Sequence, residues 1–421
     1  METLNLLGGS GGMHLWAIAT AAVVAAGCAV VGTLLVVRRM SLLGDAISHA
    51  VLPGIVVAVL LGGRPGGLLV LVGAVVAALL TVWLTQLLHE GVGMSEDAGA
   101  GVVFTTLFAL GVVLITLAAS RIDLDPSCVL YGILELVPFD TLLLGGVEVP
   151  RAFLTAGLVF LCLLGGVTLL WKEFLSSAFD PAAAAAAGLP VAGLTMGLLG
   201  ATALATVAGF EAVGAILVVA MLVVPAAAAE LLVQRLHLVM GLAIALGVLG
   251  GIVGYLAAWR FNTSAAGMIA VVLGMEYALA VLLAPGHGIL ARAWAAAGLA
   301  WRVACEDRLA VQWRAEEGGG RAADAAGLFP WLVCLWLRVS GRIAADGRLL
   351  PLGKTEAMLI VRSHRLWEAW LGRHVALPLD HLHPPAEWIE HHLGSEVRRR
   401  IAADVGQPAG DPHGRTIPPE G

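Results

Sequence analysis

Runs of about 20 apolar residues recur along the chain, and each is long enough to cross the hydrocarbon core of a bilayer as a helix. Nine such runs lie at about 14–37, 43–62, 67–88, 98–119, 152–171, 191–209, 212–233, 237–259 and 265–284. The short sixth and seventh runs could also form one broken unit. We therefore expect an all-α polytopic membrane bundle of about nine transmembrane helices.

The charged residues divide the chain into a membrane part and a water-soluble part. With 59% hydrophobic and 13% charged residues, the chain is more apolar than a soluble fold can bury. Of 24 Lys and Arg residues, eight precede residue 285 and 16 follow it. We predict a transmembrane domain at 1–284, a linker with a surface helix at 285–327 and a cytosolic domain at 328–421.

Basic residues near the span ends, at 38–39, 172 and 235, favour an outer N-terminus and a cytosolic C-terminus. Arg121, Arg151 and Arg260 oppose this topology, because they lie on its outer side, although two of them have acidic neighbours. The N-terminus has no basic region before its first apolar run, so a retained helix is expected rather than a cleaved signal.

The net charge of −6 gives no indication of nucleic-acid binding. The five cysteines lack paired spacing, so neither a disulfide framework nor a thiolate zinc site is predicted.

One ionisable pair, Asp45 and His49, lies in the second apolar run, within RRMSLLGDAISHAVLPGI at 38–55. The two residues are four apart and therefore share one face of a helix. Ionisable groups at membrane depth are costly and usually face a water-filled path or a partner. An imidazole and a carboxylate together suit Mn²⁺, Zn²⁺ or Fe²⁺. The pair is thus either part of an ion path or an interfacial ion pair that anchors the helix end.

The loop at 174–190 predicts a short cytosolic helix between two spans. Pro181 after Asp180 is typical of a helix N-terminus, and Gly188 with Pro190 would end the helix. Such a helix could dock a partner, or it could be an ordinary loop helix. Glu211, Glu230 and Glu276 lie in or near spans, and we assign them no role.

The tail after residue 285 has the order of a winged-helix unit. A helix is expected at Trp294–Ala315, a hinge at Gly318–Gly320 and an apolar helix at Leu328–Val339. Asp346-Gly347 between short strands predicts a two-residue hairpin turn within 343–352. An amphipathic helix is expected at about Thr355–Arg373. We therefore expect a small α/β winged-helix-like and helical domain.

Histidines and carboxylates then recur at helical spacing in the tail. Glu387, Glu390 and His391 share one helix face, and His364 with Glu368 repeats the four-residue spacing. Two such faces packed together could hold Mn²⁺ or Fe²⁺. A solvated charged helix with interhelical pairs is the alternative.

A nucleotide-binding loop is not predicted. The nearest match to the phosphate-binding motif, GRLLPLGKT at 347–355, has five residues between its glycines, whereas the motif requires four. We therefore expect that the chain does not bind nucleotide and is not an enzyme.

The stretch GDAISHAVLPG resembles the signature of permeases of metal-type ABC importers, which carry zinc, manganese or iron. The resemblance continues in family order over about residues 12–284, through stretches at 101–111, 131–134, 179–181, 188–190, 213–227 and 262–264. It implies that Asp45 and His49 contact the ion and gate its path. It also implies that the 174–190 loop rests on the ATPase subunit through Phe179, Asp180, Pro181, Gly188, Leu189 and Pro190. Most members have polar residues where this chain has Ala182–Ala187, which implies a different docking chemistry.

The tail resembles the metal-binding and dimerisation domain of diphtheria-toxin-repressor-type regulators in HRLWEAWL, LDHLHPPAEWIEHHLGSEVRRRI and GQPAGDPHGRTIP. The resemblance implies metal ligands at His364, Glu387, Glu390 and His391 and an ancillary site at Glu368 and His383. Glu387 stands where iron-responsive members have Cys, which favours manganese. The family's remaining ligands come from a first helix that the sequence does not reveal here. Glu306, Asp307 or another chain could complete the site.

Together these patterns predict the permease subunit of an ATP-driven importer of divalent transition-metal ions, with manganese favoured over zinc or iron. The resemblance implies a cytosolic ABC ATPase, an extracytoplasmic metal-binding protein, a homodimer or paired permease, and a place in the cell membrane. No cofactor is expected for transport, and the metal serves as substrate and possible regulatory ligand of the tail. DNA is not expected as a partner. The alternatives are a membrane-tethered metal-responsive transcription regulator, a siderophore or cobalamin permease, and a tail that is a scaffold without metal.

Overall fold

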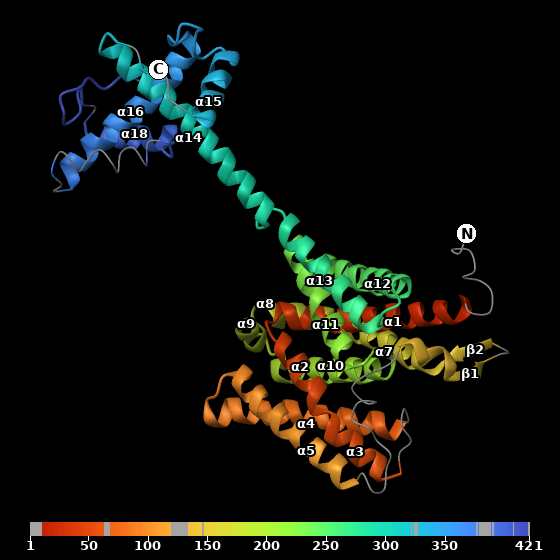
Figure 1. The fold of residues 1–421 in the computed structure, drawn as a ribbon. Helices are drawn as coiled ribbons and strands as arrows, with labels where there is room; N and C mark the ends of the chain where they lie inside the picture. Colours follow the sequence, from red (N-terminus) through yellow and green to blue (C-terminus); the bar gives the residue numbers. More distant parts are fainter. Residues whose placement is uncertain are drawn as a thin grey trace. The chain divides into compact units, whose positions relative to one another are not determined.

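The computed structural model describes residues 11–62, 68–118, 134–144, 147–320, 322–323, 327–375, 378, 389, 391–406 and 408–419. The chain forms two compact units, Met1–Ala291 and Arg292–Gly421. The elements follow the order α1 (Gly11–Val37), α2 (Ser41–Ala50), α3 (Leu52–Leu60), α4 (Leu68–Val92), α5 (Glu96–Ala118), η2 (Leu134–Phe139), β1 (Thr141–Leu144), β2 (Val147–Pro150), α7 (Arg151–Leu169), α8 (Trp171–Phe179), α9 (Pro181–Ala186), α10 (Val191–Val213), α11 (Ala215–Leu232), α12 (Leu236–Phe261), α13 (Ala265–Leu283), α14 (Ile289–Glu317), α15 (Leu328–Val339), α16 (Pro351–His374) and α18 (Ser395–Asp404) (Figure 1).

Eight helices in the described part of the chain are long and apolar enough to cross a membrane, namely α1, α4, α5, α7, α10, α11, α12 and α13. The expected runs at 191–209 and 212–233 are two separate helices, α10 and α11. Gly214 between them has φ of 82°, a conformation that favours glycine and interrupts the helical path. Each of the two helices is long and apolar enough to cross a membrane by itself.

The expected span at 43–62 is not one continuous helix. It consists of α2 and α3, which have 10 and 9 residues and meet at Val51. Pro53 lies in the first turn of α3, and its ring nitrogen cannot donate the hydrogen bond that would continue α2. The α2 helix packs on α5 and α10, whereas α3 packs on α4 and α5.

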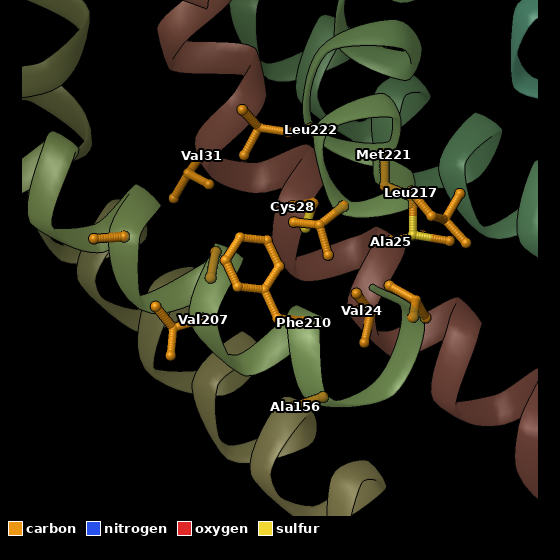
Figure 2. Packing of buried hydrophobic residues seen from close by; sticks show 14 of the residues in the cluster. Val24, Ala25, Cys28, Val31, Ala156, Val207, Phe210, Leu217, Met221 and Leu222 are labelled. Carbon is orange, nitrogen blue, oxygen red and sulfur yellow. The ribbon is translucent and has the colours of Figure 1, made fainter. Parts of the chain in front are cut away.

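The first helix forms the centre of the membrane unit. α1 packs against α7, α10, α11 and α12, and 78% of its apolar window is buried. Figure 2 shows Cys28 and Val31 of α1 beside Phe210 of α10 and Leu222 of α11. Inside a membrane the hydrophobic effect does not drive helices together, so small residues that allow close van der Waals packing favour their association.

A short hairpin precedes α7 and was not predicted. β1 and β2 pair antiparallel, with Thr141 opposite Pro150. In the preceding η2 turn, the Glu135 carboxylate accepts a hydrogen bond from the Ala265 N–H at 3.1 Å. This bond satisfies one of the free N–H groups at the start of α13.

The second unit has the expected helix, hairpin and helix order in α15, residues 343–349 and α16. The hairpin differs in detail from the expectation. Its strands are reduced to a single bridge between Ile343 and Leu349, and three residues separate Ala344 from Arg348, whose backbone groups are hydrogen-bonded. Gly347, at φ of 86°, ends this three-residue loop, and glycine is the residue that a loop of this kind requires.

The core of the second unit includes α14, which the sequence placed in a linker. Leu309 of α14 is 1% exposed and clusters with Val333 and Leu337 of α15 and Ala357 of α16. The α16 helix begins at Pro351, four residues before the expected start, because proline is well suited to the first turn of a helix.

Candidate functional site

The α2 helix carries both positions of the predicted ion path. Asp45 and His49 lie four residues apart in this helix, but the side chain of Asp45 is outside the described residues. The half-buried imidazole of His49 lies beside Phe104 and Phe108 of α5, with ring centroids 6.1 and 6.0 Å away. Two phenyl rings of α5 thus lie next to the imidazole.

The predicted loop helix is present as α9. The Asp180 carboxylate accepts a hydrogen bond from the Ala183 N–H at 2.9 Å, and Pro181 is the first helical residue. Gly188 has φ of 87° and ends the turn after α9. Phe179 is 66% exposed, and Ala184 is the buried residue of α9. The loop therefore presents a phenyl ring and alanine methyl groups, a surface recognised by shape more than by charge.

A cavity of about 80 Å³ lies between α4 and α10, near the start of α2. Sequence reasoning did not find it, because its residues come from three distant segments. Its lining comprises Met40, Val82, Thr85, Gln86, His89, Thr195 and Leu199. The His89 Nδ1 is 2.7 Å from the Met94 carbonyl oxygen, which orients the ring.

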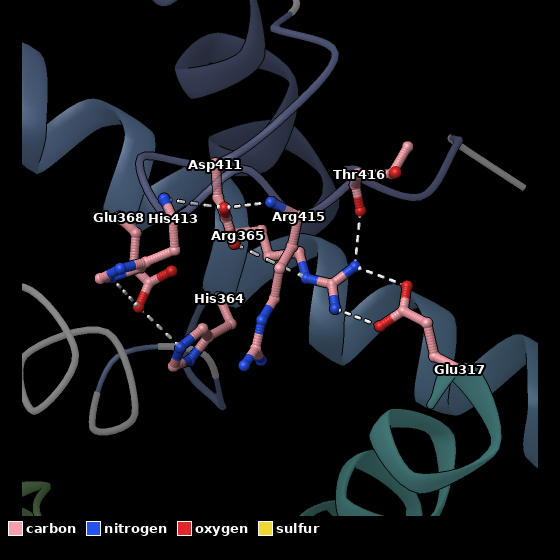
Figure 3. Close-up of polar contacts among 8 residues, drawn as sticks. All are labelled: Glu317, His364, Arg365, Glu368, Asp411, His413, Arg415 and Thr416. Carbon is pink, nitrogen blue, oxygen red and sulfur yellow. Dashed lines mark hydrogen bonds and ion pairs between the residues drawn. The ribbon is translucent and has the colours of Figure 1, made fainter. Parts of the chain in front are cut away.

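In the second unit, α16 brings together two of the predicted tail residues. His364 Nε2 is 3.1 Å from Glu368 Oε1, and both side chains are almost fully buried. His413 Nε2 approaches the same carboxylate oxygen at 3.9 Å (Figure 3). The predicted ancillary residue His383 lies outside the described residues.

His391 lies between two carboxylates of α14. Its Nδ1 is 2.7 Å from Glu306 Oε2, and its Nε2 is 3.1 Å from Asp307 Oδ1. The helix expected at Trp294–Ala315 is α14, and it places the carboxylates of Glu306 and Asp307 beside this predicted ligand. Glu387 and Glu390 fall outside the described residues.

The donor types around His391 fit a divalent metal, since imidazole and carboxylate groups suit Mn²⁺ and Fe²⁺. The geometry is that of a hydrogen-bonded site, because each ring nitrogen faces a different carboxylate. Within the described ranges, no three His, Cys, Asp or Glu side chains converge on one point. A metal would have to replace at least one of these hydrogen bonds.

A buried arginine joins three segments of the second unit. Arg365 of α16 is 2% exposed and donates two hydrogen bonds, at 3.0 and 2.5 Å, to Glu317 at the end of α14. It also donates to the Thr416 carbonyl at 2.5 Å and lies 3.9 Å from Asp411 (Figure 3). These hydrogen bonds hold the pKa of the Glu317 carboxyl below its ordinary value.

Glu317→Gln is expected to weaken the second unit at pH 7 and to make little difference in acid. The folded-state pKa of Glu317 lies below 4.5, so the ionised carboxylate stabilises the fold above that pH. This stabilisation is lost as the pH falls through the lowered pKa. The measurement is hydrogen exchange of α16 amides in the detergent-solubilised full chain, with wild type and variant compared at each pH. An equal difference at pH 7 and in acid would contradict the assignment.

The fold is that of a multi-pass membrane protein with a mostly helical tail. Residues 12–284 match the ABC 3 transport family, and the chain belongs to this family. Residues 351–419 match the metal binding and dimerisation domain of iron dependent repressors. Both resemblances drawn from the sequence are thereby confirmed, as is the predicted fold class.

Several transport proteins are similar to the first unit. The manganese transport system membrane protein MntD of Bacillus subtilis is 42% identical over 278 residues, which cover 66% of this chain and 94% of the relative. The zinc transport system membrane protein TroD of Treponema pallidum is 37% identical, covering 66% and 76%. The chelated iron transport system membrane protein YfeD of Yersinia pestis is 34% identical, covering 63% and 81%.

A solved structure shares the fold of the membrane unit. PsaBC from Streptococcus pneumoniae in complex with Fab matches with a TM-score of 0.55 and 29% identity. The match covers 65% of this chain and 92% of that chain.

Proposed function

We propose that this chain is the permease subunit of an ATP-driven importer of divalent transition-metal ions, with manganese favoured over zinc or iron. The observation that carries the proposal is the family match over residues 12–284, within which the relatives are named for manganese, zinc and chelated iron. Transport of a metal is the common element of these names. The preference for manganese draws support from the 42% identity to a manganese transport protein.

Asp45 and His49 form the ion path in this proposal. A carboxylate and an imidazole one helical turn apart replace part of the hydration shell of a divalent ion. The phenyl rings of Phe104 and Phe108 limit the rotation of His49, so less ordering is needed when the ion binds. The break at Val51 separates α2, which carries both residues, from α3.

In this proposal, ATP hydrolysis by a partner subunit supplies the energy for transport. We assign the loop around α9 as the docking point for a cytosolic ATPase, with Phe179, Asp180 and Pro181 on one side and Gly188, Leu189 and Pro190 on the other. An extracytoplasmic binding protein delivers the ion, and a second permease copy or subunit completes the pathway. This arrangement places the tail in the cytosol.

The tail is proposed to sense metal. His391, Glu306 and Asp307 supply imidazole and carboxylate donors, and His364, Glu387 and Glu390 complete the set that the resemblance implies. A bound divalent ion would supply positive charge that draws α14 and the 387–391 segment together. Glu368 and His383 would form the ancillary site.

The regulator alternative is not favoured by α15, the helix before the hairpin. Its Phe329, Trp331 and Trp336 side chains are each about half exposed, at 48%, 56% and 51%. Arg338 is the one basic residue of this helix. DNA binding depends on neutralising phosphates with several basic groups, and an exposed apolar face does not supply them.

The test is uptake of radiolabelled Mn²⁺, Zn²⁺ and Fe²⁺ by cells that co-express the partner subunits. Saturable uptake of Mn²⁺ that excess unlabelled Zn²⁺ or Fe²⁺ inhibits weakly is the expected result. Uptake of none of the three ions would refute the proposal and favour a siderophore or cobalamin permease.

His391→Ala is expected to abolish inhibition of transport by internal metal while leaving the initial rate in depleted cells unchanged. The variant removes the imidazole that bridges Glu306 and Asp307. The measurement compares uptake in Mn²⁺-loaded and depleted cells, with expression from a promoter that does not respond to metal. His374→Ala is the matched control, since this tail histidine pairs with the exposed Asp404. Equal inhibition of wild type and His391→Ala would rule out sensing at this site.

A further inference from the structure

Arg38 lies in the tight corner between α1 and α2. Backbone hydrogen bonds from Arg39 N–H to the Val36 carbonyl and from Met40 N–H to the Leu35 carbonyl, at 2.9 and 2.8 Å, close this corner. Arg39 has φ of 59°, a conformation uncommon for a residue with a side chain. The corner is therefore tightly constrained, and its last residue leads directly into α2.

The guanidinium of Arg38 bridges the two helices on either side of α9. Its Nη2 donates to Ser177 Oγ of α8 at 2.5 Å, and its Nη1 donates to Thr195 Oγ1 of α10 at 3.1 Å. The group also lies over the Phe174 ring, 5.8 Å from its centroid. One planar group thus holds the helix that enters the α9 loop and the helix that leaves it.

Both hydroxyls are arranged to accept these hydrogen bonds. Ser177 Oγ donates its own proton to the Glu173 carbonyl at 2.7 Å, and Thr195 Oγ1 donates to the Val191 carbonyl at 3.0 Å. A hydroxyl has a single proton, so each oxygen presents its lone pairs to Arg38. Among the described residues, Arg38 forms no ion pair with a carboxylate, and its Nε has no hydrogen-bond acceptor.

This placement differs from that of an arginine that only anchors a helix end at the membrane surface. Long basic side chains at such ends usually extend toward water. Arg38 instead is half-buried and reaches inward to two hydroxyls, whereas its neighbour Arg39 is exposed. The bridge links the α9 loop to the corner that begins α2.

We infer that Arg38 is a positioning residue that transmits displacement of the α9 loop to α2, and through α2 to Asp45 and His49. The inference rests on the proposed function. A partner that pushes on α9 moves the end of α8 and the start of α10, because both are joined to α9 by short connections. The guanidinium of Arg38 moves with these two helices because it is hydrogen-bonded to both. The backbone of Arg38 leads into α2, so α2 moves as well.

The test measures ions imported per ATP hydrolysed by the complete complex in proteoliposomes. Arg38→Met removes the guanidinium group that donates both hydrogen bonds, and the double variant Ser177→Ala with Thr195→Val removes both acceptors. Each is expected to lower the ratio by about tenfold, within the range of about 5- to 150-fold typical of coupling between sites. Combining all three changes is expected to be no worse than Arg38→Met, since both variants break the same link.

Two controls separate coupling from folding. Ser176→Ala removes the neighbouring exposed hydroxyl of α8, which donates a hydrogen bond to the Lys172 carbonyl of the same helix, and Arg39→Met removes the adjacent exposed charge. Both are expected to keep the wild-type ratio. Basal ATP hydrolysis and co-purification of the ATPase are expected to be unchanged in all variants.

An unchanged ratio of ions imported per ATP in the Ser177/Thr195 double variant overturns the inference. This test holds even if the Arg38→Met complex fails to assemble. A loss of uptake and hydrolysis in equal proportion overturns it as well, because that is the signature of lost folded protein. A wild-type complex that moves none of the three ions instead overturns the proposed function. The two failures are therefore distinguishable.

Discussion

Uptake of the transported ion is expected to fall to background when His49 is replaced by alanine. His49 supplies the nitrogen donor on α2, and the side chain beside Phe104 and Phe108 is already restricted before any ion arrives. Alanine has no atom that can bind a metal ion, so the nitrogen ligand is lost. The measurement is initial uptake of radiolabelled Mn²⁺, normalised to the amount of protein in the membrane.

His237→Ala is the matched control for this variant. His237 lies exposed in the first turn of α12, so uptake is expected to stay at the wild-type level. Normal uptake in His49→Ala would show that the imidazole is not on the path, and the interfacial anchor would then be the better interpretation. Asp45→Asn tests the second position in the same assay and is expected to reduce uptake similarly.

Gly32→Ala is expected to prevent stable folding of the membrane unit. A Cβ atom at Gly32 would lie 1.9 Å from the Leu222 carbonyl oxygen and 2.9 Å from its carbonyl carbon. The clash is with backbone, so α1 and α11 would have to separate. Overpacking of a core usually costs about 1–3 kcal/mol, and a backbone clash at the central helix lies at or above that range. The measurement is the yield of monodisperse protein after detergent extraction, together with its Tm.

Gly165→Ala in α7 gives the comparison, because a Cβ atom there meets nothing within 4 Å. The yield and Tm of this variant are expected to match those of wild type or to be slightly higher, since alanine has a higher helix propensity than glycine. Equal yield and Tm for the Gly32 and Gly165 variants would show that α1 and α11 do not approach each other as closely as described.

The membrane fold could be predicted because its information is local. Length and composition identify a span without reference to the rest of the chain, and eight of the nine expected runs are single helices. The exception at 43–62 contains Pro53, which lies in the first turn of α3 and interrupts the helix within an otherwise apolar run. The helix at α9 was predicted from Asp180 and Pro181 for the same local reason.

The sequence by itself identified which segments form helices and which of them are apolar enough to cross a membrane, and it indicated both family resemblances. Only the tertiary structure decided which side chains meet. Arg38 contacts Ser177 and Thr195 across 139 and 157 residues of chain, and His391 contacts Glu306 across 85. Periodicity and capping involve neighbours a few residues apart, whereas these contacts depend on how whole helices pack. That packing is set by steric fits such as the one between Gly32 and the Leu222 backbone, which no local pattern of residues contains.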